Sequence, residues 1–110
     1  MSGEHPREAF HPLGEGLLVN MDGSCYSGQM IARKDGSFPE PARHGLGLQL
    51  FSDGSFYAGE YSQDKAEGQG FFCSSEGSMY YGAFKDDIRH GFGQEYCTTG
   101  VCYVGEFKQG

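Results

Sequence analysis

Tryptophan is absent from this 110-residue chain, and it has few basic residues. Eight Lys and Arg stand against 15 Asp and Glu, and the resulting net charge of -7 repels phosphate backbones, so no nucleic-acid partner is expected. The net negative charge also disfavours binding to anionic lipid headgroups, so membrane contact is not expected either. No apolar run is long enough to span a bilayer, and the first residues lack the apolar core of a signal peptide. We therefore expect a cytoplasmic protein.

Signatures of catalysis, cofactor binding and metal binding are also lacking. The Gly-x-Gly pairs have no third glycine and open strands, whereas a phosphate-binding loop opens a helix. Cysteines and histidines do not fall at zinc-ligand spacings. His44 and His90 occupy one repeat position visited twice, and no serine or cysteine is tied to either by a catalytic signature. The sequence therefore predicts a protein that is not an enzyme and that has no cofactor and no metal site.

What the chain does contain is a repeat of glycine and tyrosine with a period of 23 residues. Each copy holds a Gly-x-Gly pair, then a turn glycine, then Tyr-x-Gly-x followed by a large apolar residue. The tyrosines of the four copies are Tyr26, Tyr57, Tyr80 and Tyr103, and the large apolar residues are Met30, Tyr61, Phe84 and Phe107. Self-similarity of this kind predicts a repeat array in which each unit packs against its neighbours.

The clearest unit, residues 45–67, predicts one β-hairpin. Its two alternating segments flank Asp53-Gly54, a tight-turn signal, and a polar connection over residues 62–68 leads to the next unit. We therefore expect an all-β fold, an elongated meander of antiparallel hairpins. The two-residue period places Tyr57, Gly59 and Tyr61 on one face, where the glycine leaves space for a neighbouring ring and the rings stack edgewise.

The array is expected to span residues 14–110, as about four repeats preceded by a flexible segment over residues 1–13. The first connection carries eight extra residues within 31–43, and this insertion holds Phe38. It is either a tolerated surface loop or a recognition loop that presents Phe38. The last strand is expected to be an exposed edge, which could pair with a second copy, or the chain could be a shortened form of a longer array.

The four cysteines give two expectations. Cys25 and Cys102 stand at the repeat position where the other copies carry Phe56 and Met79, so cysteine is expected to act there as a small hydrophobe. Cys97 and Cys102 flank a hairpin turn and could pair across it, although the expected cytoplasmic setting disfavours a disulfide.

Several segments together resemble the MORN repeat. They include Tyr57-Ala58-Gly59-Glu60-Tyr61, Tyr80-Tyr81-Gly82-Ala83-Phe84-Lys85, Tyr103-Val104-Gly105-Glu106-Phe107-Lys108 and Arg89-His90-Gly91-Phe92-Gly93. The resemblance implies an extended meander of hairpins and a non-catalytic interaction module, often associated with cytoskeleton, cilia, flagella or membrane junctions. It also implies an aromatic-lined groove for a helical or extended partner segment, and arrays that can dimerise, here through the C-terminal edge.

These observations predict that the protein is an interaction scaffold or adaptor, which holds a protein segment along an aromatic face of the sheet. The candidate binding residues on that face are Tyr57, Tyr61, Tyr80, Phe84, Tyr103 and Phe107. The same rings could instead form only the core between repeats, in which case specificity would lie with Phe38, Tyr81 and Phe92. The alternative function is a module that binds phospholipid surfaces.

Overall fold

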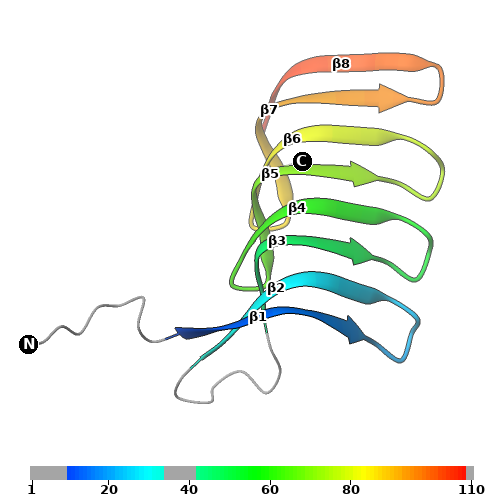
Figure 1. Ribbon diagram of the computed structural model, residues 1–110. Coiled ribbons are helices and arrows are strands. Elements are labelled where there is room, and N and C mark those ends of the chain that lie inside the picture. Colours follow the sequence, from blue (N-terminus) through cyan, green and yellow to red (C-terminus); the bar gives the residue numbers. More distant parts are fainter. Residues whose placement is uncertain (1–9, 34–41, 109–110) are drawn as a thin grey trace, which may run out of the picture.

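The structure is a computed structural model that describes residues 10–33 and 42–108. It contains eight strands and no helix in this part of the chain: β1 (Phe10–Val19), β2 (Cys25–Arg33), β3 (Ala42–Leu50), β4 (Phe56–Ser62), β5 (Lys65–Cys73), β6 (Met79–Lys85), β7 (Ile88–Cys97) and β8 (Gly100–Phe107). They form one sheet in the order β1 to β8, with every neighbouring pair antiparallel (Figure 1). The radius of gyration is 15.8 Å, above the roughly 13 Å of a compact domain of similar size. The predicted all-β meander of hairpins is confirmed.

The turns that close the hairpins have the predicted tight geometry. Gly54 has a φ of 96°, and the Phe51 amide donates to the Ser55 carbonyl at 2.9 Å. The Asp53 carboxylate accepts from the amide and the hydroxyl of Ser55 at 2.9 and 2.6 Å. The Asp-Gly-Ser turn is therefore held by its own side chains.

The connections between hairpins are shorter than the sequence predicts. Gln63 and Asp64 both have positive φ, 47° and 74°, and this pair alone links β4 to β5. Residues 65–68, which we assigned to a polar connection, belong to β5. Two left-handed residues fit the twist of a hairpin, so the strands continue through and the hairpins merge into one sheet.

The array also begins earlier than predicted. β1 starts at Phe10, inside the segment over residues 1–13 that we expected to be flexible, and Phe10 pairs with Arg33. The reason is that β2 extends to Arg33 and offers ladder partners to these residues. The insertion within 31–43 follows β2, and its residue Phe38 lies outside the described residues.

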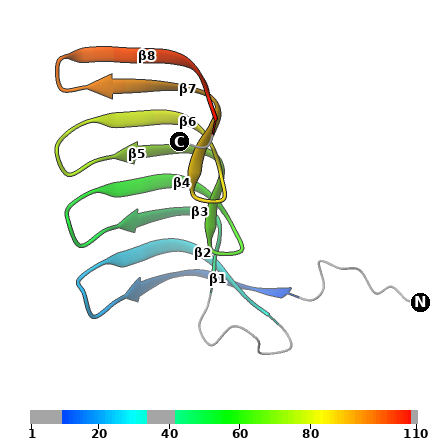
Figure 2. The ribbon, with the colours of Figure 1, turned by 180° about the vertical axis from the view of Figure 1, so that it is seen from behind.

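A row of glycines crosses the whole sheet and marks a fold line. It is Gly16, Gly28, Gly47, Gly59, Gly70, Gly82, Gly93 and Gly105, each in register with the next. Bulges lie beside this row in three of the strand pairs. Figures 1 and 2 show each hairpin bent into two arms. We call the arm with the hairpin turns the tip arm (residues 17–27, 48–58, 71–81 and 94–104) and the other the base arm (residues 10–15, 29–33, 42–46, 60–69, 83–92 and 106–108).

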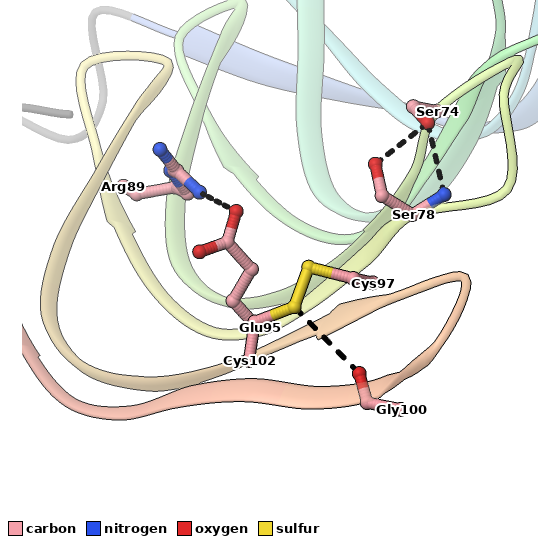
Figure 3. Close-up of a disulfide and its surroundings, with 7 residues drawn as sticks. All are labelled: Ser74, Ser78, Arg89, Glu95, Cys97, Gly100 and Cys102. Atoms are coloured by element: carbon pink, nitrogen blue, oxygen red, sulfur yellow. Dashed lines mark hydrogen bonds and ion pairs between the residues drawn. A yellow bond between two sulfur atoms is a disulfide. The ribbon is translucent and has the colours of Figure 1, made fainter.

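A disulfide joins Cys97 to Cys102 in the last hairpin, with the Cα atoms 5.7 Å apart (Figure 3). We expected the cytoplasmic setting to disfavour this bond. The two Cα atoms nevertheless lie within the range that a disulfide spans. In the ladder, Cys97 pairs with Gly100, and the register shift between Glu95 and Tyr96 leaves Cys102 without a ladder partner. Cys25 and Cys73 are free and half-buried.

Candidate functional site

The concave side of the bend, which we call the inner face, is filled by one continuous stack of rings. Tyr57 contacts Tyr61 and Phe84 edge-on, with ring centroids 5.1 and 4.9 Å apart. Tyr80 repeats this with Phe84 and Phe107 at 5.1 and 4.9 Å. Each ring pair therefore joins a tyrosine of the tip arm to a ring of the base arm, and the predicted edgewise stacking is confirmed. The stack is also the core of the protein.

The repeated Tyr-x-Gly-x motif has a hydrogen-bonding reason that sequence reasoning missed. The Tyr57 hydroxyl donates to the carbonyl of Glu60 at 2.8 Å, and the other three repeat tyrosines make the same bond to the residue three positions on. The ring therefore lies along its own strand over Gly59. A Cβ on Gly70, in the next strand, would also overlap the Tyr57 ring. Only glycine leaves room for the ring on both strands.

Burial changes the acidity of these tyrosines. It raises the pKa of Tyr57 to about 12 and raises the pKa of Tyr61 further. The pKa values of Tyr26 and Tyr80 rise for the same reason. All four hydroxyls are therefore neutral at physiological pH, and the stack carries no negative charge.

Two arginines lie over the stack, and sequence reasoning did not single them out. Arg43 lies 4.6 Å from the Tyr61 centroid and donates to the Asp64 carboxylate at 2.8 Å. Arg89 lies 5.0 Å from the Phe107 centroid and 3.3 Å from Glu95. Arg43 and Arg89 occupy the same position of the 23-residue repeat, where the repeat between them carries Ala66. This recurrence in the sequence could have identified the two arginines.

A cleft of about 360 Å³ opens on the inner face beside the stack. Phe72, Tyr80 and Phe84 line its apolar part, and Ile88 lies at one wall. The ion pair between Arg89 and Glu95, drawn in Figure 3, forms part of the polar wall. The cleft therefore combines an aromatic surface with charged groups of both signs.

The candidate residues from the sequence separate into two faces. Tyr57, Tyr61, Tyr80, Phe84 and Phe107 are buried in the stack, each at most 9% exposed. Tyr103 ends the stack and is half exposed. Side chains so deeply buried offer little surface to a partner, although Tyr80 and Phe84 reach the cleft.

Tyr81 and Phe92 lie on the convex side, which we call the outer face. They are 54% and 73% exposed and line a shallow hollow together with Gln69 and Val104. A second hollow lies beside it, between Tyr81 and Tyr96. The structure therefore brings Tyr81 and Phe92 together but separates them from the buried rings.

On the tip arm, the outer face carries an apolar band that we call the outer strip. By the two-residue period of the strands it comprises Leu17, Val19, Cys25, Ser27, Leu48, Leu50, Phe56, Ala58, Phe71, Cys73, Met79, Tyr81, Gln94, Tyr96 and Val104. None of these described residues is charged. Period-two alternation applied to every strand would have revealed this band.

Charge is divided between the two arms. The Lys and Arg residues of the described part lie on the base arm, namely Arg33, Arg43, Lys65, Lys85, Arg89 and Lys108. The tip arm holds only acids, namely Asp22, Asp53, Glu76 and Glu95. The two arms therefore present different electrostatic surfaces.

His44 has a structural partner: its Nδ1 accepts from the Gln63 amide at 3.1 Å. Within residues 10–33 and 42–108, no three His, Cys, Asp or Glu side chains are grouped as metal ligands. In the same part of the chain, no helix is long and apolar enough to cross a membrane.

The fold is a single-sheet repeat array with a ring stack in its bend. An array of this class presents accessible surface along its length. Comparison with family models gives three consecutive matches to the MORN repeat, over residues 42–56, 57–79 and 80–102. The chain belongs to the MORN-repeat family. No curated protein matches it. MORN repeats are generally modules for interaction with proteins or membranes and are generally not enzymes.

Proposed function

We propose that the protein is a non-catalytic scaffold or adaptor that holds a partner protein segment, helical or extended, on the inner face. The cleft beside the stack is the observation that carries this proposal. An apolar side chain of the partner would pack on Phe72 and Tyr80. The pair Arg89 and Glu95 would offer polar contacts at its wall. Apolar anchors in pockets supply most of the affinity of such interfaces.

In this proposal the buried rings have a structural role and do not contact the partner with most of their surface. They stabilise the bend, and the bend forms the inner face. The residues that we expect to touch a partner are therefore Phe72, Ile88, Arg89 and Glu95, together with the exposed edges of Tyr80 and Phe84.

The test is photocrosslinking in extracts of ciliated cells, with a photoreactive amino acid at position 88. The Phe72→Ala variant, with the crosslinker still at position 88, should lose the crosslinked partner. Tyr81→Ala is the matched control, since it removes an exposed ring from the outer face. Circular dichroism would confirm that both variants fold. Retention of the same partner by the cleft variant would refute the inner face as its site.

The setting of this scaffold is also a proposal. We infer a cytoplasmic protein of a cytoskeletal, ciliary or flagellar assembly, supported only by its membership of the MORN-repeat family. Localisation of a tagged chain in ciliated cells would test this. Diffuse signal without enrichment at the cytoskeleton or axoneme would contradict it.

Binding to phospholipid surfaces is the second candidate, and one observation favours it. Lys65, Lys85 and Lys108 are exposed on the base arm. Asp64, Asp86 and other acids stand beside them, however, so the local charge is mixed. Flotation with anionic liposomes at low and high salt would test it, with salt-sensitive flotation as the supporting result.

A further inference from the structure

The outer strip is an apolar surface that the fold itself leaves uncovered. Leu17 and Val104 are 64% and 63% exposed, and Tyr81 is 54% exposed. Leu46 and Phe92, just beyond the glycine row, extend the apolar area. Contiguous apolar area without charge, on a chain with 21% charged residues, is typical of an interaction surface.

Acids border the outer strip on both of its long sides. Along the tips lie Asp22, Asp53 and Glu76, and along the glycine row lie Glu15, Glu60 and Glu106. The carboxylates of Asp22 and Asp53 accept hydrogen bonds from Ser24 and Ser55, and these bonds lower their pKa. Asp22 and Asp53 therefore keep the border along the tips negative at physiological pH. No Lys, Arg or His lies on the tip arm.

The shape of the strip indicates the conformation of its partner. Eight strands at a spacing of about 4.8 Å make a band about 34 Å long, which matches an α-helix of about 22 residues. An extended peptide across the face of a sheet would find no free ladder groups to pair with. A helix satisfies its own backbone and needs only an apolar stripe.

We infer that the outer strip is a docking site for a basic amphipathic helix of a partner protein. The apolar stripe of the helix lies on Leu48, Phe71 and Tyr81, and its flanking Lys and Arg face the acids on both borders. A second copy of this chain would bring the same acids together, and an anionic membrane would meet them as well. This inference does not depend on the inner-face function.

The probe is a synthetic Leu/Lys peptide of about 22 residues, patterned as an amphipathic helix. Two further peptides are a scrambled Leu/Lys sequence and the same pattern with Glu in place of Lys. Fluorescence anisotropy at physiological salt should show binding of the patterned Leu/Lys peptide. The other two peptides should bind at least about tenfold more weakly.

Paired variants locate the binding. Leu48→Ser/Tyr81→Ser, both exposed, and Glu76→Lys/Glu106→Lys should each weaken it about tenfold or more. The matched control is Glu67→Lys, an acid of the base arm. It should stay within about twofold.

Four outcomes would overturn the inference. The first is binding of the Leu/Glu peptide as tight as that of the patterned Leu/Lys peptide. The second is binding that survives both pairs of strip variants. The third is a dimer, detected by sedimentation, that Leu48→Ser/Tyr81→Ser dissociates. The fourth is tighter binding to vesicles of equal phosphatidylserine and phosphatidylcholine than to the peptide. Failure of the inner-face crosslink would leave this result unaffected, because Phe72 and Tyr81 lie on opposite faces.

Discussion

At the scale of single residues, the recurring glycines serve two separate needs. Gly54 and Gly77 adopt positive φ in tight turns, where other residues are strained. Gly70 does not have a positive φ, yet the Tyr57 ring covers its backbone. At Gly70, the missing side chain is therefore a requirement of space alone.

Gly70→Ala isolates this requirement. The new Cβ would overlap the Tyr57 ring, which is buried and cannot move freely, so we expect a loss of about 1–3 kcal/mol in the free energy of unfolding. Gly105→Ala is the control: its Cβ would meet the Tyr103 hydroxyl at 2.7 Å, but Tyr103 is half exposed and can shift. Urea denaturation would measure both, and equal losses would contradict this account.

The tyrosine hydroxyls lead to a pH prediction. Tyr57 ionises near 10 in the unfolded chain and near 12 in the folded one. A raised pKa in the fold contributes stability that is complete below pH 10 and lost as the pH rises towards 12. Wild type should therefore lose stability across this window.

Tyr57→Phe separates ionisation from hydrogen bonding. Near pH 8 the variant should be less stable by about 1 kcal/mol, because the bond to Glu60 is lost. By about pH 11 this difference should shrink, since phenylalanine has no proton to lose. Guanidinium denaturation at both pH values would show it. A difference that stays constant with pH would rule out the ionisation effect.

At the scale of elements, the tight turns and strand faces were predictable because they depend on local signals. Asp53-Gly54 encodes its turn, and the two-residue period assigns Tyr57 and Tyr61 to one face. The turn at Gln63-Asp64 was not recognised, because neither residue is glycine and the left-handed pair shows only in the backbone.

The split of the candidate site was less accessible from sequence. Tyr80 and Tyr81 are adjacent and both aromatic, yet one is 2% exposed and the other 54%. Period two separates them, but only the bend shows which side becomes the core. The cleft formed by Phe72 and Ile88 depends on contacts between different strands, which no local signal reports.

The last hairpin gives a prediction at this scale. Its disulfide spans a sequence separation of 5, and so short a loop contributes about 2 kcal/mol in the chain-entropy model. Cys97→Ser/Cys102→Ser should lower stability by up to this amount and speed hydrogen exchange in β7 and β8. Reductant should reproduce the effect in wild type and in the Cys73→Ser control, but not in the double variant. If reductant leaves exchange in wild type unchanged, the bond does not stabilise the hairpin.

At the scale of the whole molecule, the ring stack links the successive hairpins in series. Phe84 contacts Tyr57 of the preceding hairpin and Tyr80 of its own, and Phe107 continues the series. In a repeat array, stability is close to a sum of unit and nearest-neighbour terms. The cost of losing a ring should therefore depend on its place along the stack, rather than on its size alone.

Phe84→Ala and Tyr103→Ala test this dependence. Phe84 is 8% exposed and joins two hairpins, so its truncation should cost about 3–5 kcal/mol. Tyr103 ends the stack and is 45% exposed. Among the rings of residues 10–33 and 42–108 it contacts only Phe107, so we expect its loss to cost much less. Urea denaturation followed by far-UV circular dichroism gives the free energies. Hydrogen exchange should show that Phe84→Ala loosens β4 and β5 as well as β6, because the contact that joins the hairpins is gone. If only β6 and its turn respond, each hairpin is stable through its own contacts and the stack does not couple them.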